Sequence, residues 1–345
     1  MIPTAPFDAL QDAARAHSSA NHAGEYMDEI QRLLAESLPE VEVALQRATK
    51  GPEPLDEASA HLVMAGGKRV RPVSTLLVHG ACGGGERAPV VSLAAAVELI
   101  HTATLLHDDV MDEGEERRGR PASRMLWGNL VSVLSGDLLL TSALSLVQTS
   151  KVDGAMDDTL ATMQRLIAGE VAQLKARGLD SLGIEGYLEI ARGKTASLFS
   201  CACRFGARAA GAGPEVVDAA GRFGERVGIA FQIVDDVLDL EGVPHEVGKA
   251  LGHDLAEGKT TLPLALALKS ASAELRPLLI DARAGDTVAA AKVSQAKPVQ
   301  EACVEARAYA MRETEEGLRE LQTLPASRQR ELLAALTRGL IERRA

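Results

Sequence analysis

Aromatic side chains are scarce in this sequence: phenylalanine, tryptophan and tyrosine together make up 3% of the 345 residues. Hydrophobic residues nevertheless make up 46%, so the core must be built mainly from alanine, leucine and valine. Such a core suits packed helices better than strands, which favour aromatic and β-branched residues. Because no stretch alternates polar and apolar residues with period two, the sequence predicts a helical protein.

Net positive charge is lacking as well. The formal charge of −11 argues against a general binder of nucleic acid or of anionic membranes, since the non-specific part of such binding is electrostatic. Any anion must therefore be bound by a local cluster of basic residues.

Cysteine is limited to four positions, none with zinc-type spacing, and Cys201 and Cys203 are expected to be small buried hydrophobes. Residues 1–17 lack the basic start and apolar run of a signal peptide. The most apolar long window, Leu130–Val147, contains Asp137 and several serines. We therefore expect a buried helix there, with no membrane span, and a cytoplasmic protein.

Helical periodicity, punctuated by glycine and proline, covers nearly the whole chain after a weakly patterned arm of residues 1–24. The expected helices are a segment before Gly83 and residues 26–49, 55–65, 89–112, 122–150, 153–178, 184–211, 214–240, 260–285, 298–323 and 326–343. No linker rich in proline or serine divides residues 25–345, and so we predict a single all-α domain, a bundle of helices.

Two copies of the pattern Asp-Asp-x-x-Asp stand far apart in the chain. They consist of Asp108, Asp109 and Asp112, and of Asp235, Asp236 and Asp239. In each copy the first and last aspartates are four residues apart, so they project from the same face of a helix. Like charges at this spacing repel each other, which indicates that a cation lies between them.

Magnesium fits such carboxylates, because it is usually held by one or two of them together with substrate phosphates. A single copy of the pattern would be interpreted as a solvated helix end. Two copies, each after an apolar helix and each near basic residues, favour a shared metal site.

Basic residues accompany both acidic motifs. The segment Gly66–Pro72 (GGKRVRP) places three cations within four positions, beside two glycines that let the backbone approach a phosphate. Taken alone, it could equally be an exposed basic turn. Arg117 and Arg118 follow the first acidic motif directly, and so they must lie near its metals.

Further cations stand later in the chain. Lys194 and Thr195 are expected to open a helix, whose first N–H groups would favour an anion. Residues 248–261, which include Lys249 and Lys259, are punctuated by glycine and read as a mobile loop, disordered without ligand, that closes over a substrate. Carboxylates, magnesium and several separate cations describe a site for two polyanionic substrates.

Together the motifs resemble those of the trans-type polyprenyl diphosphate synthases, from about Tyr26 to the C-terminal helix. They stand in the family's order: GGKRVRP at 66–72, LLHDDVMDEGEERRG at 105–119, Gly169-Glu170 with Gln173, GKT at 193–195, FQIVDDVLD at 231–239 and EGKTTLPL at 257–264. The resemblance implies an all-α bundle around a deep central cavity, usually a homodimer. It also implies a reaction that joins an allylic diphosphate to isopentenyl diphosphate head to tail.

By this resemblance, the two acidic motifs hold about three Mg²⁺ ions that bridge the allylic diphosphate. The implied metal ligands are Asp108, Asp112, Asp235 and Asp239, and Asp109 and Asp236 are carried over with them as catalytic residues. The metals stabilise charge that develops on the leaving diphosphate. Additional positive charge at this group is expected from Arg117, Lys194, Lys249 and Lys259.

The second substrate, isopentenyl diphosphate, is expected at Lys68, Arg71, His101 and Arg118, with its double bond facing the nascent carbocation. Such positioning removes much of the entropic barrier. Thr195 and Gln232 are candidate supports near the cation. Apart from the resemblance, His101 reads equally as a satisfied histidine on a half-buried helix, and His107 is interpreted as structural.

Product length is predicted from the helix before the first acidic motif. Thr104 lies four residues before Asp108, about 5.4 Å away on the same face, and Ile100 lies one turn further. In the family the preceding position, here Ala103, also borders the growing chain, and short-chain relatives carry aromatic side chains at one or both positions. Ala103 and Thr104 are small, and HTATLLHDDV resembles the long-chain octaprenyl and solanesyl type, so we expect a product longer than geranylgeranyl. Alternatively, both residues are small because two helices cross tightly there.

Other functions remain open at this point. A short-chain farnesyl or geranylgeranyl diphosphate synthase would use the same site. A terpene cyclase needs no second diphosphate site such as Lys68 and Arg71, and its usual second metal motif of Asn/Asp-Ser/Thr-Glu type is missing from residues 235–239. A non-catalytic partner subunit should have lost acidic residues, yet all six are present.

Overall fold

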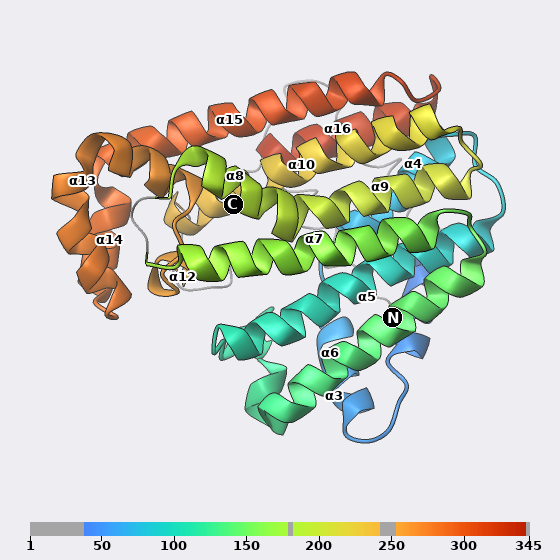
Figure 1. Cartoon of the computed structure of the whole chain (residues 1–345), viewed down its shortest axis with the longest axis horizontal. Coiled ribbons are helices and arrows are strands. Elements are labelled where there is room, and N and C mark those ends of the chain that lie inside the picture. Colours follow the sequence, from blue (N-terminus) through green and yellow to red (C-terminus); the bar gives the residue numbers. More distant parts are fainter. Residues whose placement is uncertain (1–37, 179–181, 242–252, 343–345) are drawn as a thin grey trace.

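The computed structural model describes residues 38–178, 182–241 and 253–342, and these residues form an almost entirely helical bundle (Figure 1). After helical residues 38–48, the elements are α3 (Leu55–Val63), α4 (Val70–Ala81), α5 (Arg87–Met111), β1 (Glu116–Arg117), β2 (Arg120–Pro121), α6 (Ser123–Ser150), α7 (Ala155–Ala176), α8 (Ile184–Ala191), η1 (Arg192–Ala196), α9 (Ser197–Ala209), α10 (Pro214–Glu241), α12 (His253–Ala256), α13 (Leu262–Arg283), α14 (Thr287–Gln295), α15 (Lys297–Leu321) and α16 (Arg328–Glu342).

The long helices lie side by side, with α5 against α6 and α10 between α9 and α15 (Figure 1). Glycines let several of them approach closely, because the absence of a Cβ admits a neighbouring backbone. A Cβ at Gly206 in α9 would lie 2.3 Å from the Thr75 carbonyl oxygen of α4, and one at Gly224 in α10 would lie 2.5 Å from the Phe199 carbonyl oxygen of α9. These crossings hold α4, α9 and α10 together in the middle of the bundle.

The core is built from leucine, valine and alanine, as the composition predicted. One buried cluster joins α5, α6 and α9, a second joins α4, α9, α10 and α16, and a third joins α8, α10, α13 and α15. Because α16 near the end of the chain packs on α4 near its beginning, the described residues do not divide into separate halves. The proposed arm, residues 1–24, lies outside the described residues.

The all-α prediction is confirmed, with most helix limits within a few residues of those expected. Three details differ. The region between the helices expected at 260–285 and 298–323 contains α14, whose N-cap Asp286 accepts hydrogen bonds from the N–H groups of Val288 and Ala289. A two-residue hairpin, β1–β2, follows the first acidic motif. The short helix α12 lies within the segment read as a loop.

Two described helices, α5 and α6, are long and apolar enough to cross a membrane by length and composition alone. The most apolar window of α5 is 72% buried, as in a core helix, but that of α6 is only 33% buried. The expectation of a buried helix at Leu130–Val147 is therefore wrong in part. Leu139 is fully buried, whereas Leu130 and Leu134 are 73% and 42% exposed.

Candidate active site

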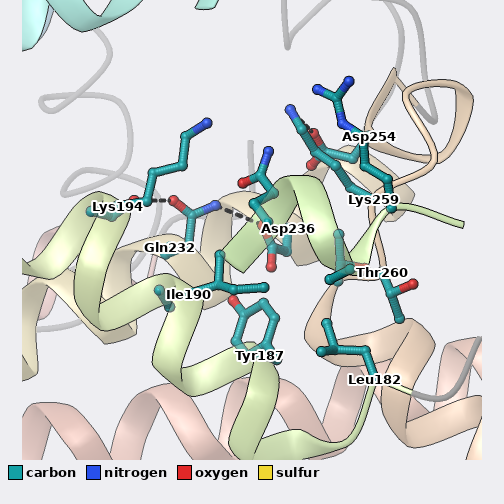
Figure 2. Close-up of a pocket in the computed structure, with 15 residues that line it drawn as sticks. Leu182, Tyr187, Ile190, Lys194, Gln232, Asp236, Asp254, Lys259 and Thr260 are labelled. Atoms are coloured by element: carbon teal, nitrogen blue, oxygen red, sulfur yellow. Dashed lines mark hydrogen bonds and ion pairs between the residues drawn. The ribbon is translucent and has the colours of Figure 1, made fainter. Parts of the chain in front are cut away.

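A cavity of about 1080 Å³ lies between α5, α6, α7 and α10. One part of its wall is charged, and the remainder, which includes Leu140, Leu166 and Val171, is largely apolar. A smaller pocket of about 100 Å³ adjoins it and shares Lys194, Thr195 and Gln232 with it (Figure 2). The fold thus joins a polar site to a large apolar space.

Most residues predicted from the sequence meet at these two pockets. The residues that line the large cavity are Lys68, Arg71, Ile100, His101, Thr104, Asp108, Arg117, Arg118, Lys194, Thr195, Gln232 and Asp235. Asp236 and Lys259 line the small pocket. Lys249 lies outside the described residues, with the rest of segment 248–252 of the loop expected to be mobile; the other part of that loop, residues 253–261, is described and contains α12.

The first acidic motif stands at the C-terminal end of α5. Asp112 follows the last residue of the helix, but its N–H still bonds to the Asp108 carbonyl oxygen at 2.8 Å. The Asp108 carboxylate lies 3.4 Å from the Lys194 Nζ. The Asp112 carboxylate lies 3.7 Å from the Lys259 Nζ and is in contact with the Arg177 guanidinium. Both outer carboxylates are therefore faced by cations.

The second acidic motif lies near the end of α10. Asp235 lines the large cavity, whereas Asp239 accepts a hydrogen bond of 3.2 Å from the N–H of Asp254. Asp239 therefore contacts the N-terminal turn of α12, and it is not among the residues that line either pocket.

The middle aspartate of each motif is buried and turned toward protein. Asp109 is fully buried, and Arg117 donates to its Oδ1 from Nε and Nη2 at 2.8 and 2.6 Å. Asp236 is 2% exposed and accepts a hydrogen bond of 2.8 Å from Gln232. Burial raises the pKa of Asp236 well above its ordinary value. Arg117 thus ties the β1–β2 hairpin to α5, a role that the sequence did not predict.

The carboxylates fit magnesium held jointly with a substrate. Among the described residues, no group of three or more acidic, histidine or cysteine side chains is arranged to enclose a metal. Magnesium instead takes one or two carboxylates plus substrate phosphates and water, and Asp108, Asp112 and Asp235 offer oxygens of that type. In the structure the ammonium groups of Lys194 and Lys259 face the carboxylates of the first motif. Their positive charge offsets the negative charge of these carboxylates.

Lys194 and Thr195 do not open a helix, and that expectation is wrong. They lie in η1, a π-helical turn inside the continuous run from α8 to α9, so no set of free N–H groups is available there. π-helical turns of this kind are frequent at functional sites. The Lys194 Nζ lies 2.7 Å from Glu170 of α7 as well as 3.4 Å from Asp108.

A chain of hydrogen bonds crosses the boundary between the two pockets. The Thr195 hydroxyl donates to the Gln232 Oε1 at 2.6 Å, and the Gln232 amide donates to Asp236 at 2.8 Å (Figure 2). The buried Tyr187 lies beside Asp236, and burial raises the pKa of its hydroxyl. Thr195 and Gln232 are thereby held in fixed orientations on the wall of the large cavity.

The basic cluster forms another part of the charged wall. The Arg71 guanidinium lies 4.7 Å from the centre of the Phe199 ring. Arg118 donates to the carbonyl oxygens of Leu62 and Gly66. Burial, together with Arg71 and Arg118, lowers the pKa of His101 well below its usual range, so its imidazole is neutral. The cluster offers several N–H donors to an anion.

Lys259 is held among three carboxylates. Its Nζ lies 3.6 Å from Asp254, 3.7 Å from Asp112 and in contact with Glu257. Burial alone would lower the pKa of Lys259, but the three carboxylates outweigh it and hold that pKa above its ordinary value. The side chain therefore stays positively charged next to the first acidic motif.

The residues predicted to control product length do not all line the cavity. Thr104 and Ile100 line the large cavity. Ala103 is fully buried in the cluster of α5, α6 and α9, and it is not among the lining residues. The expectation that Ala103 borders the product is therefore not met, since one residue along a helix turns the side chain to a different face.

Several residues at the site were not assigned roles from the sequence. They are Arg69, Glu98, Glu170, Arg177 and Tyr187. Glu98 had a recognisable signal, because a carboxylate within the apolar run from Leu93 to Leu99 is expected to be buried and therefore paired. No sequence pattern indicated a role for Arg177, since its contact with Asp112 joins residues 65 positions apart.

Known proteins with similar sequences are polyprenyl synthetases and prenyl diphosphate synthases. The family described as polyprenyl synthetase matches residues 52–298. The all-trans-nonaprenyl-diphosphate synthase (geranyl-diphosphate specific) of Rhodobacter capsulatus is 39% identical over 83% of this chain and 88% of its own. The short chain isoprenyl diphosphate synthase of Methanothermobacter thermautotrophicus is 36% identical over 85% of this chain and 91% of its own.

A solved structure agrees in fold. The polyprenyl synthase of Caulobacter crescentus CB15, determined in complex with calcium and isoprenyl diphosphate, superposes with a TM-score of 0.86. It is 33% identical, and the match covers 92% of this chain and 98% of that one. With the motifs, the cavity and these matches in agreement, the chain belongs to the polyprenyl synthetase family.

Proposed function

We propose that this protein condenses an allylic diphosphate with isopentenyl diphosphate, repeatedly, to give an all-trans, long-chain polyprenyl diphosphate. One observation carries the proposal: the first aspartate of each acidic motif, Asp108 and Asp235, and a cluster of arginines lie on the wall of one cavity that is otherwise largely apolar. Acidic motifs with metal and a basic cluster bind two diphosphates, and the apolar space receives a hydrocarbon chain.

The allylic diphosphate lies at the acidic motifs. Asp108, Asp112, Asp235 and Asp239 would hold magnesium there, and the bound metal supplies Lewis-acid stabilisation of the leaving diphosphate. Lys194 and Lys259 already lie within 4 Å of the first-motif carboxylates, and they add positive charge at the same group. Arg117 acts indirectly, because its guanidinium holds Asp109.

Isopentenyl diphosphate lies at the arginine cluster, where Lys68, Arg71 and Arg118 bind its diphosphate. The neutral imidazole of His101 donates a further hydrogen bond from the cavity wall. Because the cluster and the acidic motifs border the same cavity, the double bond of one substrate faces the allylic carbon of the other. This arrangement replaces a bimolecular encounter by a positioned one.

The proposed reaction transfers the allylic group from its diphosphate to isopentenyl diphosphate. The allylic C–O bond breaks, and its electron pair leaves with the diphosphate. The double bond of isopentenyl diphosphate attacks the allylic carbon and forms a C–C bond. The resulting cation then loses a proton to the departed diphosphate, which restores a double bond. Lys194 and Lys259 stabilise the departing charge, while Thr195 and Gln232 present oxygen atoms near the developing cation.

The long-chain product is supported by the composition of the apolar wall. Besides Thr104, this wall contains aliphatic side chains such as Ile100, Leu166, Ile167 and Leu174. No aromatic side chain stands at position 103 or 104. The nonaprenyl synthase relative makes a product of this class, whereas the short-chain relative keeps that alternative within the same family.

A homodimer is part of the proposal, as is a cytoplasmic location. Exposed apolar side chains gather on α6 and α7, among them Leu130 at 73%, Ile167 at 64% and Leu174 at 48%. A second copy would cover them, because monomers rarely expose a large apolar patch. Ile167 and Leu174 also line the cavity, so this partner would complete its wall.

Incubation of the purified protein with isopentenyl diphosphate, a farnesyl primer and Mg²⁺ tests the proposal. We expect products longer than geranylgeranyl on chromatography and none in the presence of a chelator. Asp108→Ala and Asp235→Ala should each lower turnover by orders of magnitude, because each removes a ligand that acts in the transition state. Full turnover by both variants, or by the chelated wild type, would contradict the metal assignment.

A further inference from the structure

The loop of residues 66–71 carries the cations proposed to bind diphosphate. Its backbone conformation is not favoured by its own residues. Gly66 and Gly67 adopt φ values of 86° and 146°, and Arg69 is left-handed with φ 47°. A left-handed backbone is unfavourable for a residue with a Cβ, which crowds the following carbonyl oxygen. Contacts made elsewhere must therefore hold Arg69, and with it Lys68 and Arg71, in place.

The side chain of Arg69 supplies these contacts. Arg69 is 4% exposed, and its Nε and Nη1 lie 2.8 Å from Glu42 and 2.8 Å from Glu98 respectively. Its Nη2 donates to the Val63 carbonyl oxygen at 2.8 Å. The partners belong to helical residues 38–48, to α5 and to α3, and so one guanidinium ties the loop to three helices.

Glu98 is the most deeply placed of these partners. It is 2% exposed, it lines the cavity, and it faces Arg71 and Arg118 as well as Arg69. Burial alone would raise the pKa of Glu98, but these three guanidinium groups outweigh it and hold that pKa below its ordinary value. The carboxylate is therefore ionised, and it balances positive charges that would otherwise repel each other in a poorly solvated place.

We propose that Glu98 is a positioning residue for isopentenyl diphosphate. It anchors Arg69 and therefore the loop, and it balances Arg71 and Arg118 while leaving N–H groups of both for the diphosphate. The inference rests on the proposed function, because that function assigns isopentenyl diphosphate to this cluster.

A positioning role means that Glu98 favours the binding of isopentenyl diphosphate. Electrostatic repulsion alone predicts that it weakens this binding. A negative charge beside an anion site repels the anion, so its removal alone should tighten binding and lower KM. If Glu98 positions the cluster, its removal takes away the carboxylate that Arg69, Arg71 and Arg118 share and leaves Arg69 with Glu42 as its ion-pair partner. The loop then shifts, and KM rises. The direction of the change therefore separates the two effects.

Steady-state kinetics of Glu98→Gln and Glu98→Asp provide the test. Gln keeps the shape and loses the charge, whereas Asp keeps the charge and is one methylene too short to reach Arg69. We expect both variants to raise KM for isopentenyl diphosphate about tenfold or more, as for the loss of a charge-assisted contact. KM for the allylic diphosphate should change by less than about twofold, because Lys194 belongs to η1 and Asp108 lies about three turns further along α5 than Glu98.

Controls separate positioning from a general loss of stability. Glu313→Gln removes a comparable partly buried carboxylate, 2.7 Å from Arg226 and unconnected with the cavity, and it should leave both KM values unchanged. Should the Glu98 variants fail to fold, Arg69→Lys tests the same anchor, because its single Nζ cannot reach Glu42, Glu98 and Val63 together.

The outcomes are distinct. An inactive wild type would refute the proposed function and not this inference. An active wild type whose folded Glu98→Gln or Arg69→Lys variant shows an unchanged or lowered KM for isopentenyl diphosphate would overturn the positioning role. An equal rise of both KM values, together with a lower melting temperature, would do the same, since it indicates a merely structural residue.

Discussion

At the scale of single residues, Thr104 is the side chain best placed to set product length. It lines the cavity one helical turn before Asp108, and its hydroxyl donates to the His101 carbonyl oxygen at 2.7 Å. The hydroxyl is thereby satisfied within the helix, so the side chain presents its small volume to the cavity. Its neighbour Ala103 faces the protein core instead.

Thr104→Phe should therefore shorten the product. The ring would extend into the cavity and stop the growing chain, while the first condensation, which takes place at the charged wall, should continue. Chromatography of the products measures the change. Thr104→Val, which keeps the volume, should give the wild-type length, and a wild-type product from Thr104→Phe would refute the role of this position.

Ala103→Tyr should behave differently. A tyrosine in a fully packed core forces its neighbours apart, at a cost of about 1–3 kcal/mol or more. We expect a lower melting temperature and less folded protein, with no specific shortening of the product. A stable Ala103→Tyr enzyme that makes a shorter product would restore this residue to the cavity wall.

His101 makes a pH-dependent contribution to stability. Its pKa in the folded protein lies well below the ordinary value of 6.5, so below pH 6.5 the unfolded chain takes up a proton that the folded chain does not. The free energy of unfolding should consequently fall as pH drops through 6.5. Denaturant melts at about pH 7.5 and about pH 5.5 should show a smaller loss for His101→Gln than for the wild type. Equal losses would contradict the neutral state of this histidine.

At the scale of elements, the crossing of α7 and η1 positions Lys194. Gly169 and Gly193 bring the two backbones together: a Cβ at Gly169 would lie 2.6 Å from the Lys194 nitrogen, and one at Gly193 would lie 2.8 Å from the Gly169 Cα. The close approach places Glu170 of α7 2.7 Å from the Lys194 Nζ. Side-chain geometry at the acidic site therefore depends on a contact between backbones.

Gly169→Ala should weaken both fold and catalysis. The added methyl group must push η1 away from α7, and we expect a loss of about 1–3 kcal/mol in the free energy of unfolding, with a lower kcat. Gly339→Ala is the matched control, because Gly339 lies in α16 and nothing is within 4 Å of its added Cβ. That change should stabilise the protein by about 0.5–1 kcal/mol. A Gly169→Ala variant as stable as the wild type would refute the crossing.

At the scale of the whole molecule, the exposed apolar face of α6 and α7 predicts self-association. Leu130→Glu places a charge within that face, and we expect it to convert a species of twice the chain mass into a monomer in light scattering. Val304→Glu alters an equally exposed residue, 68% accessible, on α15, and it should leave the mass unchanged. A monomeric wild type, or a Leu130→Glu dimer, would contradict the predicted interface.

The sequence by itself determined the helical class and the chemistry of the site. Helical periodicity is local, and so the spacing of four residues within each acidic motif predicted that its first and last aspartates would project from one helix face. The presence of two such motifs predicted that Asp108 and Asp235 would share a site. The structure places both on the wall of one cavity. It also places the middle residues, Asp109 and Asp236, inside the protein. The order of the motifs along the sequence likewise indicated the family.

Tertiary structure decided which side chains face which. The separation of Ala103 from Thr104, the π-helical environment of Lys194 and the exposure of Leu130 follow from how whole helices pack. The pair of Arg69 and Glu98 joins residues 29 positions apart. No local pattern encodes such contacts, because their energy depends on burial and on distances between elements, which exist only once the chain has folded.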